Sequence, residues 1–581
     1  MFAILLLFAT VQDPKRLFEQ FKVEMARDFM HQANVEDITP EIETRVLRLI
    51  QERLELDGQT VANYGFEVPE PEDDALPALF GHELRYQYQR EFLMGEVVRL
   101  GRDLNEQQRV VYDTVMDSVN RNLGKIFCLN ACGGSGKTYI INLLLMTVRS
   151  RGDIALATAT SGIAATLLEG GRTAHSTFKV PVFNLEDTST CNMTKIDQTG
   201  RLMQRAKLII IDEVTMGHKK MYECIDRSLR YVLDEPDKPF GGVTVLLAGD
   251  FRQILPVVPR KGRAETVDAC IKNSHLWPSM TKLTLNINMR ARFGGPEVQA
   301  FVDFILKVGE GKLPYEVGHG GWKVMIPREL CVDTADELMN FVYDAADDSD
   351  WDNHRWVNSR AIIVPKNSQA RDINYKIMDE KLRGDFVCHY SRDTKDDADN
   401  VEYLNGDSYP EEFLHSLEPS GFPPYALKLK PKSSIMLLRN MVPLEAHVNG
   451  ARYTVKEIHR SLIVAIKATG TNAGHIFMIP RIDVHSAPDS PFQFARRQFP
   501  VKPAFAITSN KGQGQSYDKA GIHLDTDFFT HGQLYVALSR VGSQDNVRVY
   551  VKNGGKLPRL PGVPHKEGCF TNNVVYSEVL D

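Results

Sequence analysis

One glycine-rich segment restricts the fold of this chain more than any other feature. Residues 131–138 read Ala-Cys-Gly-Gly-Ser-Gly-Lys-Thr and lie between an apolar run at 126–129 and a helical stretch at 139–148. A glycine-rich turn from a strand into a helix surrounds phosphate with backbone N–H groups, and the lysine neutralises its charge. The segment therefore predicts a phosphate-binding loop in an α/β sheet, although Ala131 replaces the first glycine of the usual pattern; a plain glycine-rich turn is the alternative.

The loop predicts a set of nucleotide contacts. Lys137 is expected to neutralise the β and γ phosphates, and the Thr138 hydroxyl is expected to contact Mg²⁺. The candidate nucleotide-binding residues of the loop are Gly133, Gly134, Ser135, Gly136, Lys137 and Thr138.

A second apolar run, 208–211, ends in two carboxylates, Asp212 and Glu213. The carboxyl ends of buried parallel strands are where ligands of α/β proteins bind. We expect Asp212 to hold Mg²⁺ through water and Glu213 to orient and deprotonate the attacking water. Two solvated acids at a strand end are the alternative. A third strand, within 241–256, ends in polar residues and is expected to place Gln253 where it would sense the γ phosphate; a plain strand-to-loop exit is the alternative.

The rest of the pattern indicates several units. Apolar runs at 126–129, 154–157, 208–211 and 243–248 alternate with helical stretches, which is typical of a parallel sheet covered by helices. Residues 14–100 have helical periodicity. The short β-rich runs between 425 and 485 predict a small barrel inserted into a second α/β unit.

Composition excludes several classes of protein. A net charge of −6 and a pI near 6.3 exclude a uniformly basic nucleic-acid coat, so any such contact must be local. The 8 cysteines form no CxxC pair, which argues against a zinc ribbon and for a reducing compartment. No apolar run reaches the roughly 18 residues of a membrane span. The apolar start at 2–9 is interpreted as a buried helix or strand, and secretion is not expected.

Nine segments, the glycine-rich loop included, occur in the order seen in superfamily 1 helicases. The other eight are residues 104–108, 158–162, 171–178, 208–213, 248–259, 285–290, 508–516 and 531–541. From about residue 100 to 575, the chain resembles the petite-integration-frequency (Pif-type) DNA helicases, and most closely the helicase part of Helitron transposon proteins. Full Helitron proteins also carry a nicking domain with two histidines flanking one apolar residue, and no histidine pair here has that spacing.

The resemblance implies an α/β fold with two RecA-like P-loop domains, a small β-rich, SH3-like insertion in the second, and a helical N-terminal region. The expected divisions are 1–99 (helical), 100–290 (first RecA-like domain), 291–385 and 494–581 (second RecA-like domain) and 386–493 (β-rich insertion, 2B-like).

The resemblance also implies roles for individual residues. Gln108 would read adenine, and Gly514 would contribute to nucleotide binding. Lys137, Asp212, Glu213, Gln253, Arg290 and Arg540 would be the catalytic set, with the two arginines as fingers. Thr160, His175, Phe178 and Lys511 would contact single-stranded DNA; for Phe178 the alternative is core packing, and for His175 a satisfied loop histidine.

The function implied is that of an ATP-dependent helicase that uses Mg²⁺ and moves 5′ to 3′ on single-stranded and forked DNA in repair, recombination or telomere maintenance. The expected protein is a monomer of the nucleus, or else of the mitochondrion, without membrane contact. A decayed Helitron remnant that binds ATP or DNA without unwinding is one alternative. A P-loop enzyme of another class, such as a nucleotide kinase, is the other.

Overall fold

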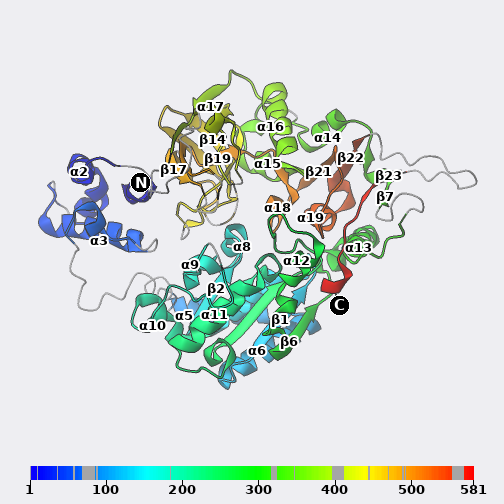
Figure 1. Cartoon of the computed structure of the whole chain (residues 1–581), viewed down its shortest axis with the longest axis horizontal. Helices are drawn as coiled ribbons and strands as arrows, with labels where there is room; N and C mark the ends of the chain where they lie inside the picture. The colour runs from blue at the N-terminus through cyan, green and yellow to red at the C-terminus, as the bar shows by residue number, and fades with distance from the viewer. Residues whose placement is uncertain are drawn as a thin grey trace, which may run out of the picture.

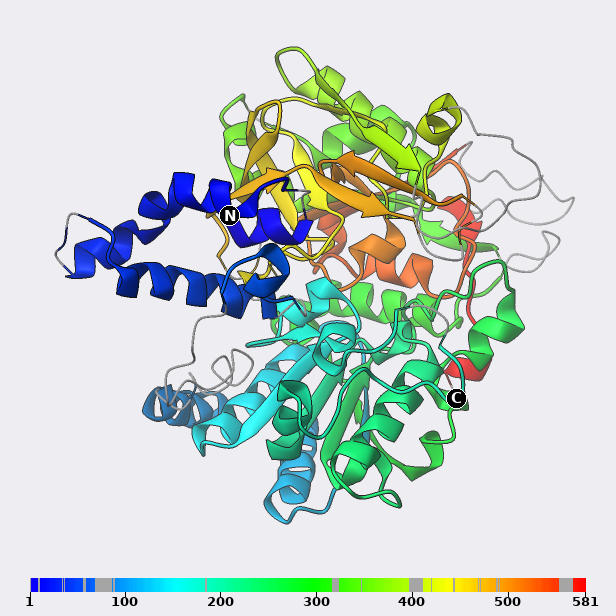
Figure 2. The same ribbon diagram turned by 60° about the vertical axis from the view of Figure 1, so that its left-hand side comes forward.

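Two parallel sheets, a β-rich part and an N-terminal group of helices make up the computed structural model (Figures 1 and 2). The structure describes residues 2–8, 11–33, 35, 37–55, 59–67, 86, 89–182, 185–315, 323–345, 347–395, 411–419, 421–442, 445–468, 470, 472–486, 490, 492–552 and 568–580.

The first unit is built on a six-stranded parallel sheet in the order β3-β2-β4-β5-β1-β6. Its strands are β1 (Ile126–Ala131), β2 (Ile154–Ala159), β3 (Arg172–Thr173), β4 (Ala206–Asp212), β5 (Thr244–Gly249) and β6 (Met280–Leu285). Its helices are α5 (Arg90–Arg102), α6 (Glu106–Asn120), α7 (Lys137–Ser150), α8 (Gly162–Thr166), α9 (Ala174–Phe178), α10 (Gln198–Arg205), α11 (Lys219–Val232) and α12 (Arg263–Asp268).

Burial on both faces explains why the central strands are apolar throughout. Along β4, Ile209 and Ile211 pack into the core shared with α11, whereas Leu208 and Ile210 pack into the core shared with α7. A parallel strand covered by helices on both faces needs apolar side chains at every position rather than at alternate ones. The predicted fold of this region is therefore confirmed.

The second unit has a five-stranded parallel sheet in the order β20-β9-β21-β22-β8. The strands are β8 (Cys331–Val332), β9 (Arg360–Val364), β20 (Ala506–Thr508), β21 (Lys519–Leu524) and β22 (Val547–Val551). The helices are α13 (Met289–Gly309), α14 (Ala335–Val342), α15 (His354–Asn358), α16 (Asn367–Lys381), α18 (Ser509–Gly512) and α19 (Gln533–Leu538). β9 and β20 are neighbours although about 140 residues separate them, because the β-rich part is inserted between them.

The β-rich part consists of antiparallel sheets. They contain β10 (Val387–Tyr390), β11 (Arg392–Lys395), β12 (Ala426–Leu429), β13 (Ser434–Leu437), β14 (Arg452–Ile458), β15 (Leu462–Lys467), β16 (Ile476–Pro480), β17 (Ile482–His485), β18 (Phe494–Gln498) and β19 (Val501–Pro503), with α17 (Glu411–Ser416) beside them. β18 pairs with β11 and β17, and β19 pairs with β13. The insertion therefore extends to Pro503, beyond the predicted division at 493, because the returning chain completes its sheets.

The N-terminal helices are α1 (Phe2–Phe8), α2 (Pro14–Ala33) and α3 (Pro40–Glu55). They lie against the β-rich part (Figure 2). Ile4 and Phe8 pack into the core of that part, and the Arg53 guanidinium donates a hydrogen bond to the carbonyl oxygen of Met441 at 3.0 Å. The apolar start is thus a packed helix. Within the described residues, no helix combines the length and apolarity needed to span a bilayer.

The last described segment connects the two sheets. β23 (Gly568–Asn572) pairs with β7 (Lys323–Pro327) beside the second unit. The chain then crosses to the first unit, where Tyr576 and Val579 are buried in its core. Glu578 pairs there with Arg263 at 2.7 Å. In Figure 1 this segment is the red trace that ends beside α13.

Candidate nucleotide and nucleic-acid site

The predicted phosphate loop connects β1 to α7 as expected. Gly134 and Gly136 have φ values of +81° and +83°, a region that glycine adopts without steric cost. A Cβ on Gly136 would lie 2.4 Å from the Gln108 side-chain nitrogen, so this close approach also requires glycine. The Asn288 amide donates to the carbonyl oxygen of Gly133 at 2.7 Å, and the Ser135 hydroxyl donates to that of Cys132. These contacts hold the loop open in front of α7.

The acidic strand end faces the lysine of the loop. Lys137 Nζ lies 2.5 Å from the nearer Asp212 oxygen and 3.2 Å from a Glu213 oxygen. Burial opposes the charge of the ammonium group, but the two carboxylates outweigh that cost and raise the pKa of Lys137 above its ordinary value. The ammonium group is therefore charged, and it is placed to exchange its carboxylate partners for phosphate oxygens.

The second unit contributes to the same site. Gln513, which follows α18, is 4% exposed and donates through Nε2 to Glu213 Oε2 at 3.4 Å. Gln513 Oε1 and Gln253 Oε1 are buried, and neither has a hydrogen-bond partner among the described residues. Buried polar atoms without partners are rare and indicate a ligand or water. Gln513 was not predicted as a site residue. The feature of the sequence that could have indicated it is its position in the polar segment that follows β20.

The residues present fit Mg²⁺ and a nucleoside triphosphate. Magnesium prefers oxygen ligands, and the Asp212 carboxylate and Thr138 hydroxyl are of that kind. Thr138 immediately follows Lys137 at the start of α7, and Asp212 ends β4. The glycine loop supplies N–H donors, and Lys137 supplies the cation.

Gln108 has structural partners in addition to its predicted contact with adenine. Its Nε2 donates to the carbonyl oxygen of Ser135 at 3.0 Å, and its Oε1 accepts from the backbone N–H of Asn105 at 3.1 Å. The side chain thus caps α6 and supports the phosphate loop. Adenine recognition by Gln108 stays a prediction.

The two predicted arginine fingers are placed differently. Arg540 is buried and donates to the carbonyl oxygens of Val536, Gly512 and Gln515, all in the second unit. Contact with a phosphate would require it to exchange some of these bonds. Arg290 is the second residue of α13, and its side chain lies outside the described residues. Gly514, with φ +75°, follows Gln513 near the site.

One of the predicted DNA contacts is wrong. Phe178 is fully buried in the core of the first unit, so a base cannot stack on its ring. Core packing, the alternative, holds because α9 turns its aromatic side chain inward. Thr160 donates through its hydroxyl to the carbonyl oxygen of Glu213 at 2.7 Å, which connects the end of β2 to the acidic strand end. His175 is half-buried in α9.

The fourth predicted contact, Lys511, lines a cavity of about 600 Å³ between the second unit and the β-rich part. Its Nζ donates to Asn449 Oδ1 at 2.9 Å. The other cationic side chains of this cavity are Lys366, Arg371 and Lys502. Phe529 also lines it and is 61% exposed, so this cavity offers an accessible aromatic ring, which Phe178 does not.

Burial and mutual repulsion change the protonation of these lysines. Burial, followed by the charge of Lys511, lowers the pKa of Lys502 to about 8. Burial, followed by the charge of Arg439, lowers the pKa of Lys511 below its ordinary value. Cations that are buried close to one another are stabilised when an anion binds beside them. The phosphate backbone of a nucleic acid is such an anion.

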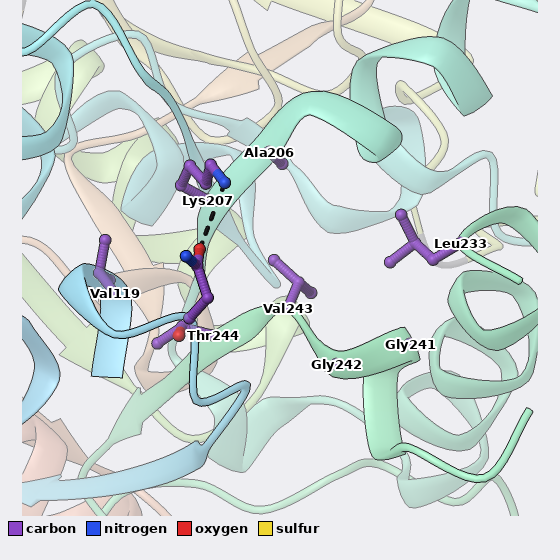
Figure 3. Close-up of a pocket in the computed structure, with 9 residues that line it drawn as sticks. Val119, Ala206, Lys207, Leu233, Gly241, Gly242, Val243 and Thr244 are labelled. Atoms are coloured by element: carbon purple, nitrogen blue, oxygen red, sulfur yellow. Dashed lines mark hydrogen bonds between the residues drawn. The ribbon is translucent and has the colours of Figure 1, made fainter. Parts of the chain in front are cut away.

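A second cavity, of about 130 Å³, is unrelated to this site (Figure 3). It lies where β4 and β5 begin, at the opposite end of the strands from Asp212. Among the described residues that line it, only Lys207 is charged, and it donates to Asn122 at 3.2 Å.

Comparison with known families agrees with this geometry. A family model described as PIF1-like helicase matches residues 103–319, and a second, described as the 2B domain of DNA helicase Pif1, matches residues 412–458. The first match covers most of the first unit and extends through α13, and the second falls on the β-rich part. Over these residues the chain is similar to the PIF1-like helicase family. The predicted resemblance is thereby confirmed at the level of the family.

Individual PIF1-like relatives cover most of this chain. The ATP-dependent DNA helicase PIF6 of Trypanosoma brucei brucei is 24% identical over 72% of this chain, and this chain covers 50% of that protein. The Pif1 helicase of Campylobacter jejuni is 25% identical over 73% of this chain and is itself 88% covered. The chain thus spans about half the length of the first of these relatives.

Solved structures agree on the fold. The Pif1 helicase from Bacteroides in complex with ADP-AlF3 and single-stranded DNA is 23% identical, with a TM-score of 0.55 over 77% of this chain and 92% of that chain. The Pif1 helicase from Candida albicans is 20% identical, with a TM-score of 0.54 over 77% of this chain and 94% of that chain. These likenesses confirm two RecA-like units with a β-rich part for this PIF1-like chain.

Proposed function

We propose that this chain is an ATP-dependent DNA helicase that couples hydrolysis of Mg-ATP to 5′-to-3′ movement on single-stranded DNA and to unwinding of forked duplexes. One observation carries the proposal: the phosphate loop, the acidic strand end and Gln513 of the other unit meet at a single charged centre. A hydrolysis site assembled from two RecA-like units changes when the units move, so chemistry and motion are linked.

Each side chain at this centre has a separate role in ATP hydrolysis. Lys137 binds the phosphate oxygens, and the backbone N–H groups of the loop orient them. Glu213 accepts the proton of the attacking water, whose oxygen forms a bond to the terminal phosphorus as the bond to ADP breaks. Thr138 and Asp212 would hold Mg²⁺, which would supply neutralisation of the phosphate charge. Gln253 and Gln513 direct their unpartnered amide oxygens to the water, and Arg540 and Arg290 act from the second unit.

The cavity with Lys511 and Lys502 serves as part of the DNA path. Lys511 and Lys502, which have no carboxylate partner among the described residues, bind the phosphates, and the exposed ring of Phe529 stacks on a base irrespective of sequence. Thr160 and His175 extend the path over the first unit. This local cluster accounts for DNA binding by a chain whose net charge is −6. We propose that the protein acts as a monomer on chromosomal DNA of the nucleus or the mitochondrion.

Steady-state ATP hydrolysis with Mg²⁺ tests the proposal. Single-stranded DNA is expected to stimulate kcat tenfold or more, because the DNA path and the hydrolysis site share both units. Duplexes with a 5′ single-stranded tail are expected to unwind, and duplexes with a 3′ tail are not. Hydrolysis that is absent, or indifferent to DNA, would contradict the proposal, as would unwinding of both duplexes at equal rates.

The affinity for single-stranded DNA is expected to fall as the pH rises from 7 to 9. The pKa of Lys502 is about 8, so the group is charged below that pH and loses its charge above it. Because phosphate binds the charged form, the loss of one charge-assisted contact is expected to weaken binding by about tenfold. Fluorescence anisotropy with a labelled oligodeoxyadenylate, whose bases do not titrate in this range, measures the change.

The matched control for this pH effect is Lys502→Arg, which keeps the charge at every pH in the range. This variant is expected to bind with a much smaller pH dependence. Equal pH dependence in the native chain and the variant would show that Lys502 does not contact DNA.

A further inference from the structure

Tyr535 makes a direct polar contact between the two RecA-like units. It lies in α19 of the second unit and is 1% exposed. Its hydroxyl donates to Asp250 Oδ2 at 2.7 Å and accepts from the backbone N–H of Gly133 at 3.3 Å. Both partners belong to the first unit: Gly133 to the phosphate loop, and Asp250 to the end of β5. One hydroxyl group of the second unit thus contacts the first unit at two places, the phosphate loop and the residue that follows β5.

Asp250 connects this contact to Gln253. The carboxylate is fully buried and also accepts from Gln253 Nε2 at 3.4 Å. Arg252 donates to the Asp250 carboxylate through its backbone N–H and Nη1. Its Nη2 donates to the carboxylate of Glu310, the residue after α13. The Asp250 carboxylate therefore holds the Gln253 amide in one orientation, with Oε1 left without a partner among the described residues.

The ring of Tyr535 is held in place from its own side. A Cβ on Gly309, the last residue of α13, would lie 2.6 Å from the ring carbon Cδ2, so only glycine allows this approach. α19 packs on α13 (Figure 1). Because this packing fixes the ring, the Tyr535 hydroxyl is held at one position. A residue that positions other groups must itself be fixed in this way.

Separation of the units would remove the hydroxyl from both partners at once. The Gly133 N–H and the Asp250 carboxylate would each lose a hydrogen-bond partner, which is costly for polar groups in a largely buried site, while Arg252 would stay beside the Asp250 carboxylate. We propose that Tyr535 is a positioning residue whose hydroxyl transmits closure of the two units to Asp250 and Gln253 and to the first half of the phosphate loop. The inference rests on the proposed function and names a residue that regulates that same site.

The test compares Tyr535→Phe with Tyr343→Phe. Tyr343 is a matched control because its buried hydroxyl donates to the carbonyl oxygen of Phe505 at 2.8 Å, within the second unit. In Tyr535→Phe we expect the DNA-stimulated kcat to fall at least tenfold while the KM for ATP changes less than twofold. In Tyr343→Phe both are expected to stay within twofold of the native chain. A merely structural role would instead move both constants or neither.

Thermal unfolding provides a second measurement. Tyr535→Phe and Asp250→Asn are each expected to lower the Tm, and the double variant by less than the sum, because the two residues share one bond. Additive shifts, or a kcat of Tyr535→Phe within twofold of native, overturn the inference while the proposed function stands. A native chain that hydrolyses no ATP overturns both.

Discussion

Alanine in place of Lys137 is expected to reduce the kcat of ATP hydrolysis by about 10²- to 10³-fold, the range found when one preorganised electrostatic group is removed from a reaction site. The ammonium group is the only cation that the described structure places between Asp212 and Glu213. Without it, phosphate oxygens would enter beside two carboxylates with no opposing charge, so nucleotide affinity is also expected to fall. Steady-state hydrolysis at saturating Mg²⁺ and single-stranded DNA measures the effect.

Lys207→Ala is the matched control for this variant. Lys207 is exposed on β4, the strand that ends in Asp212, but lies at the other end of that strand, beside the small cavity of Figure 3. Its removal is expected to leave kcat within twofold of the native value. If Lys137→Ala hydrolysed ATP as fast as Lys207→Ala, the phosphate loop would not be the site of the reaction.

The second large effect is expected from Glu213→Gln. A general base contributes typically about 10²- to 10⁴-fold, and the amide has the shape of the carboxylate without its basicity. We expect kcat to fall within that range while the affinity for a fluorescent ATP analogue changes less than threefold, because Lys137 and the phosphate loop, which bind the phosphates, are unchanged. Hydrolysis and nucleotide binding are measured on the same preparation.

Glu223→Gln controls for the loss of a buried carboxylate. Glu223 is 8% exposed in α11 and accepts a hydrogen bond from the Ser274 hydroxyl at 2.6 Å, away from the phosphate loop. Its replacement is expected to affect the Tm rather than kcat. A Glu213→Gln variant that retains kcat within threefold would show that another group takes the proton of the water.

Much of the first unit could be predicted because its signals are local. The glycines at 133–136 and the apolar run before Asp212 act through backbone conformation and strand burial, which neighbouring residues largely decide. Lys137, Asp212 and Glu213 therefore lie together as predicted. The outcome for Phe178 was different, because whether a ring faces the core or the DNA depends on the orientation of a short helix, and periodicity over five residues does not determine that.

Residues at the boundary between the units were harder to predict. Gln513 and Tyr535 lie in segments whose resemblance was recognised, yet their partners, Glu213 and Asp250, are about 300 residues away in the chain. No local pattern encodes such a pairing. The end of the β-rich part at Pro503 was missed for the same reason, since β18 and β19 find their strand partners only in the folded sheet.

The sequence by itself determined the chemistry and the class of fold: a phosphate loop followed by an acidic strand end, within alternating strands and helices, permits few structures other than a P-loop ATPase unit. Only the tertiary structure decided which side chains from the second unit complete that site, that Phe529 rather than Phe178 is exposed, and that Tyr535 bridges to Asp250. The physical reason is that local conformation follows from adjacent residues, whereas burial and contacts between units depend on how distant segments pack.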